Sequence, residues 1–150
     1  MNRYPWLDSY LRALPGATSD YKAQWDWQRY QIGGKMFAAI CQPGPKYAAY
    51  GNRPLITLKC DPDLALTLRQ SHPDILPGFY TDKRCWNSIF LDGAVPDALL
   101  SDLCEHAYAL VFAKLTKKLQ KQILNESAGA GIGPTEAARM TQDMNLQKNI

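Results

Sequence analysis

A long apolar stripe in the C-terminal half of the chain is the feature that most constrains its fold. From residue 99 to residue 119 every fourth residue is apolar: Leu99, Leu103, Ala107, Val111, Leu115 and Leu119. Residues at this spacing share one face of an α-helix, and the preceding Pro96-Asp97 is typical of a helix start. A second row widens the stripe: Leu100, Cys104, Tyr108 and Phe112. The pattern predicts one long helix whose broad apolar face packs across a β-sheet.

The first half of the chain supplies a β-hairpin for that sheet. Residues 25–32 are rich in aromatic side chains and partly alternate, which favours a strand. Residues 35–41 form a second apolar segment directly after them. Between the two, Gly33-Gly34 can adopt the positive φ angles of a tight hairpin turn. Trp25, Trp27 and Trp86 are all expected to lie in the core rather than on the surface.

Three further segments are predicted to be extended. Residues 54–60 form a strand with proline in its first position, where no hydrogen bond of the sheet is lost. Residues 86–91 form another strand, which the turn pair Asp92-Gly93 ends. Residues 79–83, after the turn at Pro77-Gly78, are expected to be extended as well.

Two shorter helices complete the predicted elements. Residues 4–14 carry apolar side chains at spacings of three and four and end at Pro15-Gly16. Asp61-Pro62-Asp63 begins a helix, with a capping carboxylate and proline in the first helical position. That helix must end by His72, because Pro73 disfavours helical geometry in the residue before it. The order of elements indicates an α+β fold with a mostly antiparallel sheet flanked by helices.

The length of 150 residues suits a single domain. The composition, 46% hydrophobic and 21% charged, excludes disorder over most of it. We predict a folded domain over residues 1–125 and a flexible C-terminal tail over residues 126–150. The tail begins with a glycine- and alanine-rich segment that is typical of a linker. Its run of glycines lacks the lysine and the preceding strand of a phosphate-binding loop.

The compartment can also be predicted. The N-terminus lacks the apolar stretch of a secretory signal, and no apolar run is long enough for a membrane span. The four cysteines, Cys41, Cys60, Cys85 and Cys104, contain no CxxC pair. A domain with a full core does not need disulfides, so reduced thiols are expected. We therefore expect a cytoplasmic protein with no membrane association.

Few residues offer the chemistry of catalysis or metal binding. Nucleophilic catalysis requires a nucleophile beside a base, but Cys104 and His106, two residues apart on a helix, point to different faces. His72 is predicted at a helix end, where its positive charge would suit the helix dipole. Cys85, Cys104 and His106 lack the paired spacing of zinc ligands, and Asp8 alone in the first helix does not make an acidic iron-binding ridge. We expect no catalytic residue, no metal and no cofactor.

The net charge of +3 is modest, but its distribution is uneven. Residues 31–60 contain no acid and the following bases: Lys35, Lys46, Arg53 and Lys59. Basic side chains on hairpins can follow the phosphates of DNA, and each contact then releases counterions. Lys83-Arg84 form a second basic site, next to Trp86 and Asn87. The tryptophan would add a stacking surface and the asparagine a polar group that reads bases.

The segments around these residues are similar to a known family. Leu58-Lys59-Cys60-Asp61-Pro62-Asp63-Leu64 leads into a helix, and Lys83-Arg84-Cys85-Trp86-Asn87-Ser88-Ile89 leads to Asp92-Gly93 and Asp97. This order and spacing resembles the MmcQ/YjbR family of small bacterial proteins over roughly residues 4–124. The family commonly has histidine before the tryptophan, where this chain has Cys85. The resemblance implies a CyaY-like (frataxin-like) two-layer sandwich of sheet and helices. It also implies a DNA-binding role, which is inferred for the family from a similar "double-wing" sheet.

Together, the residues and the resemblance predict a non-enzymatic protein that binds duplex DNA through its sheet and hairpins. The predicted contact residues are Lys35, Arg53, Lys59, Lys83, Arg84, Trp86 and Asn87. The alternative is an adaptor domain that binds a protein or a small ligand and has no nucleic-acid role. The modest charge and the abundance of tyrosine and tryptophan favour that alternative.

Overall fold

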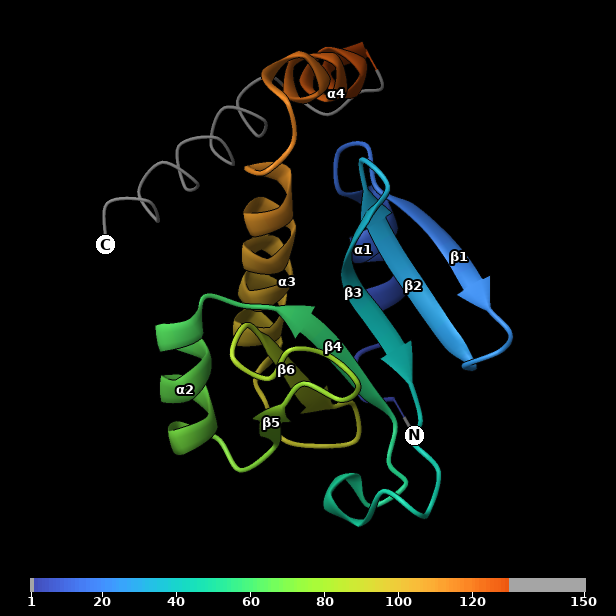
Figure 1. Ribbon diagram of the computed structural model, residues 1–150, viewed down its shortest axis with the longest axis vertical. Coiled ribbons are helices and arrows are strands. Elements are labelled where there is room, and N and C mark those ends of the chain that lie inside the picture. The colour runs from blue at the N-terminus through green and yellow to red at the C-terminus, as the bar shows by residue number, and fades with distance from the viewer. Residues whose placement is uncertain (1, 130–150) are drawn as a thin grey trace.

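A six-stranded antiparallel sheet forms the centre of the fold (Figure 1). The structure is a computed structural model and describes residues 2–129. In sheet order the strands are β1 (Thr18–Lys22), β2 (Trp27–Ile32), β3 (Lys35–Cys41), β4 (Leu55–Lys59), β6 (Trp86–Phe90) and β5 (Ile75–Pro77). The predicted α+β class with an antiparallel sheet is confirmed.

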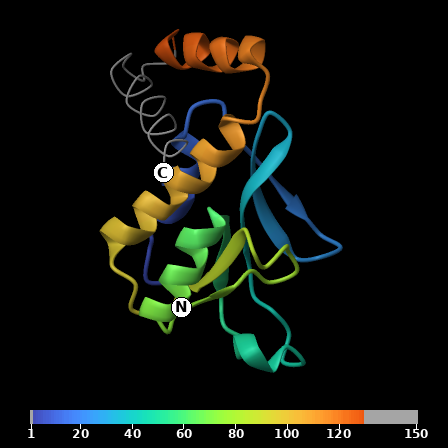
Figure 2. The same ribbon diagram turned by 60° about the vertical axis from the view of Figure 1, so that its left-hand side comes forward.

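The described helices are α1 (Leu7–Ala13), α2 (Pro62–Ser71), α3 (Asp97–Phe112) and α4 (Lys117–Gly129), with a short 3₁₀ turn, η1 (Ala48–Tyr50), between β3 and β4. Of these, α1, α2 and α3 cover one face of the sheet (Figure 2). Figure 2 shows α1, α2 and α3 together on one side of the strands, which makes two layers. Within the described part of the chain, none of the helices has the length and hydropathy needed to span a membrane.

The main core lies between these two layers. Ile56 and Leu58 of β4 and Leu100 of α3 are almost completely buried there. β3 contributes two neighbouring residues to this core, because it contains a bulge: Tyr30 pairs with Ala38, and Gln31 pairs with Met36. Phe37 is thus the extra residue, and its ring packs edge-on against Tyr108 of α3, with 5.6 Å between ring centroids. Such a bulge bends the strand and increases its twist.

Two of the local sequence signals act as predicted. Gly33 and Gly34 take φ angles of 58° and 78° at the hairpin turn. A Cβ on Gly33 would lie only 2.6 Å from the Cδ2 of Leu115, so the leucine side chain would have to shift, and the positive φ of Gly33 favours glycine independently. The carboxylate of Asp61 accepts hydrogen bonds from the backbone N–H groups of Asp63 and Leu64, as expected of a helix cap.

The single long helix predicted to reach Leu119 is wrong, because the chain breaks between α3 and α4. The side chain of Thr116 caps α4 by accepting a hydrogen bond from the backbone N–H of Leu119. The side chain of Gln120 donates to the carbonyl groups of Phe112 and Leu115 at the end of α3. Leu115 is buried in the turn between the two helices. The four-residue spacing of apolar residues therefore continues past the end of α3, although the helix itself ends. Figure 1 shows α4 lying across the end of α3.

Other boundaries also differ from the prediction. The prediction missed β1 and β5, and residues 79–83 form turns rather than an extended segment. Tyr80 has a φ of 54°, which is incompatible with a strand. The predicted start of the tail at residue 126 falls within α4, which continues to Gly129. The rest of the predicted tail, residues 130–150, lies outside the described residues.

Candidate binding surface

The outer face of the sheet, opposite to α1 and α3, carries a second and smaller apolar cluster. Alternation along the strands places Trp27 of β2, Cys41 of β3, Leu55 of β4 and Phe90 of β6 on this side. None of the described α-helices packs on them (Figure 2). Two loops, residues 42–53 and residues 78–85, cover part of the cluster instead, and Phe79 of the second loop is buried in it.

Buried hydroxyl groups fix the 78–85 loop to the sheet. The Oγ of Ser88 accepts a hydrogen bond from the backbone N–H of Phe79, with 2.9 Å between the atoms. The same oxygen lies 2.7 Å from the hydroxyl of Thr57 on the neighbouring strand. Gly78 packs so closely on Trp86 that a Cβ would lie 2.6 Å from the Cβ of that residue. The loop is therefore held in one position, although it has no regular secondary structure.

Between the two loops lies an aromatic hollow. We use this name for the open cavity of about 670 Å³ whose walls include the rings of Trp25, Trp27, Tyr47, Phe79 and Tyr80. Trp25 packs edge-on against Trp27, and Tyr80 against Phe79, with 5.5 Å and 4.9 Å between ring centroids. Among the described residues, those that line it carry no charge. A cavity of this size and lining is typical of ligand sites.

The mouth of the hollow is exposed and basic. Trp25 and Tyr80 are 56% and 67% exposed, so packing in the core does not explain why aromatic residues occur at these positions. Lys22 lies over the ring of Trp25, with 5.3 Å between ammonium and ring centroid, and Lys46 lies 5.1 Å from the ring of Tyr47. The hydroxyl groups of Tyr47 and Tyr80 are 2.7 Å apart, and this hydrogen bond lowers the pKa of Tyr47 from its ordinary value. At this mouth, Asp26 accepts a hydrogen bond from the hydroxyl of Tyr21.

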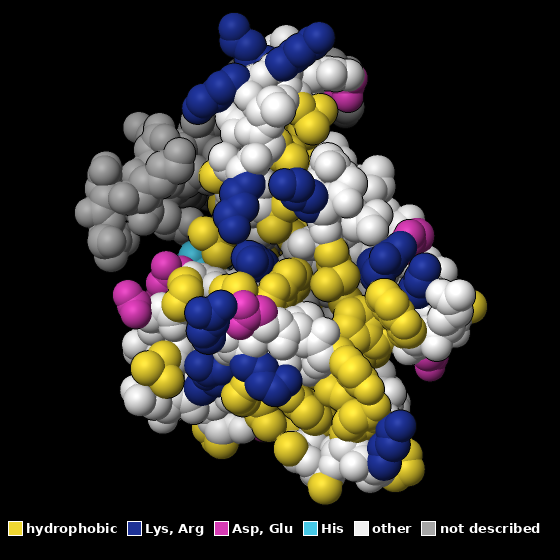
Figure 3. Space-filling model, viewed as in Figure 1, with side chains coloured by type: hydrophobic (Ala, Val, Ile, Leu, Met, Phe, Trp, Pro, Cys, Tyr) yellow, Lys and Arg dark blue, Asp and Glu magenta, His cyan; other side chains and the backbone are white. Residues whose placement is uncertain are grey.

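Next to the hollow, the 78–85 loop ends in what we call the basic edge: Lys59, Lys83 and Arg84. The ammonium group of Lys59 lies 5.3 Å from the ring centroid of Trp86. Lys83 donates to the carbonyl of Gly78, at 2.9 Å, at the point where the loop leaves the sheet. Arg84 is highly exposed and forms a 3.0 Å ion pair with Asp82. Figure 3 shows this face, with hydrophobic side chains gathered in the middle and Lys and Arg side chains beside them.

The structure thus brings together four of the seven predicted contact residues, Lys59, Lys83, Arg84 and Trp86, and separates the other three. Lys35 is exposed at the tip of the β2–β3 hairpin. Arg53 is engaged with Asp92, at 2.7 Å, and its guanidinium lies 3.7 Å from the ring centroid of Phe90.

Asn87 is the clearest correction to the predicted contact set. Its residue is 2% exposed, and its side chain points to the helical layer, where it donates to the carbonyl of Ala65 in α2. Asn87 therefore cannot read a ligand on the outer face, because strand alternation turns it to the other side of the sheet.

Sequence reasoning also placed Trp25 in the core, and this is wrong. Trp27 is buried as expected, and Trp86 is half-buried. The other rings of the hollow, Tyr47, Phe79 and Tyr80, were not identified at all. A usable signal was present: each lies in a segment with glycine or proline, where an aromatic residue has no strand or helix period to explain it.

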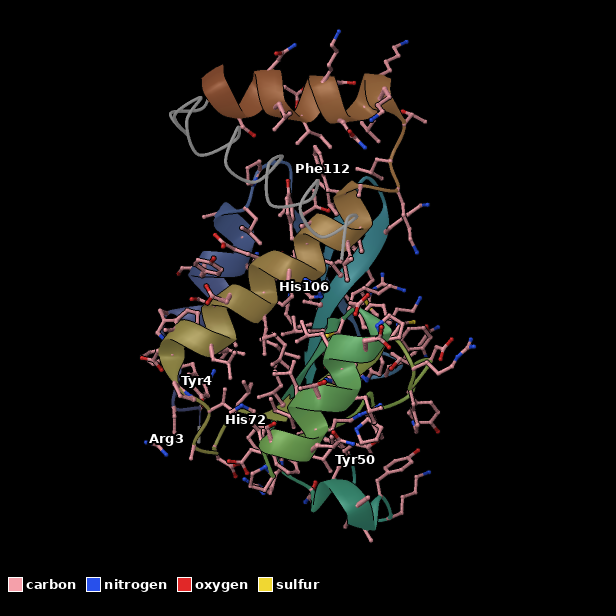
Figure 4. All side chains as sticks on the ribbon, turned by 90° about the vertical axis from the view of Figure 1, so that its left-hand side faces the viewer. Arg3, Tyr4, Tyr50, His72, His106 and Phe112 are labelled. Carbon is pink, nitrogen blue, oxygen red and sulfur yellow. The ribbon has the colours of Figure 1, made fainter. Side chains whose placement is uncertain are left out.

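Cys60, Cys104 and the two histidines do not line the hollow, whereas Cys41 does, and the thiol of Cys85 at the end of the 78–85 loop lies 3.4 Å from the ammonium group of Lys59. Burial raises the pKa of the Cys104 thiol, and it raises the pKa of Cys41 and Cys60 to about 12. The Nε2 of His106 accepts a hydrogen bond from the backbone N–H of Asp61. Figure 4 shows His106 on α3 and His72 at the end of α2, well apart. Within residues 2–129, no three His, Cys, Asp or Glu side chains are grouped as a metal site.

The fold and this surface define a class of small α+β proteins in which helices cover one face of an antiparallel sheet and the other face stays open. Within that class, the chain belongs to the YjbR family, whose family profile matches residues 12–110.

The relatives agree with this assignment. The uncharacterised protein YjbR of Escherichia coli K12 is 29% identical over 118 residues, which cover 79% of this chain and 94% of that protein. The uncharacterised protein YbdF of Escherichia coli O157:H7 is 33% identical over 94 residues, covering 63% of this chain and 71% of YbdF.

Solved structures share the fold. The crystal structure of protein DR2400 of Deinococcus radiodurans, described as a DUF419 domain, is similar with a TM-score of 0.68 and 28% identity. That similarity covers 82% of this chain and 88% of DR2400. A crystal structure of a Pseudomonas syringae protein has a TM-score of 0.63 at 23% identity, with 74% of this chain and 99% of that chain covered.

Proposed function

We propose that this protein is a non-enzymatic DNA-binding protein that contacts phosphates through its basic edge. The observation that carries the proposal is the convergence of Lys59, Lys83 and Arg84 beside the ring of Trp86. These residues come from β4, the 78–85 loop and β6, so the fold gathers charges that are separated in the sequence. Positive side chains next to an aromatic face are the groups that bind a nucleic-acid backbone.

The hydrogen bonds of these residues leave capacity for phosphate. Lys83 uses one donor on the carbonyl of Gly78, and an ammonium group has three. Arg84 is paired with Asp82, but this ion pair is exposed and therefore weak enough for a phosphate to compete. Three phosphate contacts predict a slope of about −3 for the logarithm of affinity against the logarithm of salt concentration, at roughly 0.9 per contact. Binding is expected to be moderate and strongly salt-dependent.

Fluorescence anisotropy of labelled duplex DNA, titrated at several salt concentrations, tests the proposal. Lys83→Ala/Arg84→Ala should weaken binding to every sequence and reduce the salt slope by about 2. Lys117→Ala/Lys118→Ala removes the same charge from exposed positions of α4 and serves as the matched control. An unchanged slope in the first variant would remove the basic edge from the binding site. Flat anisotropy of the unmodified protein at low salt would overturn DNA binding itself.

A specific observation favours a second candidate, the binding of a small ligand without nucleic acid. The aromatic hollow has the volume and the lining of a ligand site, and it is built by a rigidly attached loop. Heparin chromatography separates the two candidates, since a DNA-binding protein should elute well above physiological salt. Elution at or below physiological salt would favour the small-ligand candidate.

A further inference from the structure

The position of the aromatic hollow relative to the basic edge leads to a more specific conclusion about the ligand. The 78–85 loop contributes Phe79 and Tyr80 to the hollow and Lys83 and Arg84 to the edge. Because the loop packs on Ser88 and Trp86, the two sites are adjacent and fixed relative to each other. We infer that the hollow holds an unpaired base of a nucleic-acid strand whose phosphates lie on the basic edge. This inference rests on the proposed function and makes single strands the preferred ligand.

The rings of the hollow offer faces on which a base can stack. Trp25 and Tyr80 are more than half exposed, at the mouth, while Trp27 and Phe79 behind them are buried. The exposed rings are supported edge-on by the buried ones, so their orientation is fixed before a ligand arrives. Stacking of a base on such a ring contributes affinity that depends little on the sequence, because every base has an aromatic face.

The charges around the hollow match a nucleotide and not a cation. Among the described residues the lining is uncharged, which suits a neutral base, and Lys22 and Lys46 stand at the mouth. Cations are the ligands that aromatic cages otherwise prefer, but here two lysines already occupy ring faces and would repel one. A planar neutral ring that carries an anionic group fits both the uncharged lining and the two lysines at the mouth. The acids nearby already have donors: Asp26 accepts from the hydroxyl of Tyr21, and Asp82 accepts from the backbone N–H of Arg84.

Duplex DNA cannot place a base in the hollow in the same way. In a duplex the faces of the bases are covered by their neighbours, and only the base edges are open in the grooves. A protein that uses ring faces must therefore bind a strand whose bases are unstacked. The basic edge binds both forms of DNA, whereas the hollow distinguishes between them.

Anisotropy titrations with a labelled strand of mixed sequence, and with that strand annealed to its complement, test the inference. The unmodified protein should bind the single strand about tenfold more tightly than the duplex. Trp25→Ala/Tyr80→Asn should remove this preference and leave duplex affinity unchanged; asparagine tolerates the positive φ of residue 80. Trp25→Phe, which keeps a ring, should retain most of the preference. Leu66→Ala removes a similarly exposed apolar side chain from α2, in the helical layer, and should change neither affinity.

The outcomes separate this inference from the proposed function. Equal affinity for strand and duplex, or equal weakening of both in Trp25→Ala/Tyr80→Asn, overturns the inference and leaves DNA binding intact. Binding of thymidine monophosphate as tightly as the strand also overturns it, because the basic edge would then contribute nothing. Absence of binding to either DNA overturns the proposed function and the inference together. Quenching of tryptophan fluorescence by the strand, lost in Trp25→Ala, locates the base in the hollow.

Discussion

The two faces of the sheet are built by different means. On the helical face, α1, α2 and α3 cover the larger of the two buried apolar clusters, and the spacing of apolar residues along these helices matches the surface they cover (Figure 2). On the outer face, loops cover a smaller cluster and leave aromatic rings exposed around an open hollow. The helical face is the source of the stability of the fold. The outer face has rings and charges that packing does not require, and this is why we assign binding to it.

The largest effect is expected from a substitution on the helical face. Ile56 lies in the middle of the sheet, is completely buried and belongs to the main core. Ile56→Ala should lower the free energy of unfolding by about 2–5 kcal/mol, because it removes contacts and leaves a cavity. Urea denaturation followed by circular dichroism measures this. A loss below about 1 kcal/mol would contradict the assignment of stability to this face.

A smaller but clear effect is expected where the outer face is anchored. Ser88→Ala removes the acceptor for the backbone N–H of Phe79 and the partner of the Thr57 hydroxyl. Buried polar groups left without a partner should cost about 1–3 kcal/mol of folding free energy. The amide of Phe79 should also exchange faster with solvent, which hydrogen-exchange mass spectrometry or NMR detects. Ser9→Ala, at an exposed position of α1, is the matched control; equal effects of the two changes would show that the loop is not anchored through Ser88.

The pH dependence of stability tests a contact at the edge of the helical face. The hydroxyl of Tyr30 donates to Asp8, at 2.6 Å, and this hydrogen bond holds the pKa of Asp8 below its usual value of 3.8. A depressed pKa in the folded state stabilises the fold above the usual pKa, and this stabilisation is lost as the pH falls through the lower folded value. Tyr30→Phe should cost about 0.5–1 kcal/mol near neutral pH, since Asp8 stays half exposed.

Thermal unfolding between pH 2 and pH 7 checks this sign, at roughly the range in which a carboxyl titrates. The difference between the unmodified protein and Tyr30→Phe should shrink as the solution becomes more acidic. A difference that grows toward low pH would contradict the assigned direction of the pKa shift of Asp8.

The smallest effect on stability is expected at the hollow itself. Trp25 is 56% exposed, so Trp25→Ala should change the free energy of unfolding by about 0.5 kcal/mol or less. The same substitution should have a large effect on single-strand binding, and this contrast is what distinguishes a binding residue from a packing residue. A loss above about 1.5 kcal/mol in chemical denaturation would place Trp25 among the structural residues instead.

The fold was predictable wherever one local signal decided the structure. Gly33-Gly34 between two apolar segments favoured a tight turn, and Asp61 with Pro62 marked the start of α2. The break between α3 and α4 was not predictable from periodicity, because Leu115 and Leu119 continue the apolar spacing across it. The position of the break is set by the side chains of Thr116 and Gln120, which form hydrogen bonds to the ends of the two helices.

The candidate site was predictable only in part, for a related reason. Lys83, Arg84 and Trp86 are neighbours in the sequence and remain neighbours in space. The rings of the hollow come from loops far apart in the chain, and no spacing rule joins Trp25 to Tyr47 or Tyr80. Asn87 was wrongly predicted to contact DNA, because successive side chains of a strand point to opposite faces of the sheet. Which face each residue takes depends on the strand register.

The most direct test of the central claim is an NMR titration of the isotopically labelled protein with a single DNA strand at low salt. If the outer face binds, the shifted backbone amides should map to residues 22–27, 42–47 and 78–87. The helical face, including the amides of α1 and α3, should stay unchanged. Shifts concentrated on α1 and α3, or an unchanged spectrum at saturating strand, would contradict the assignment of binding to the outer face.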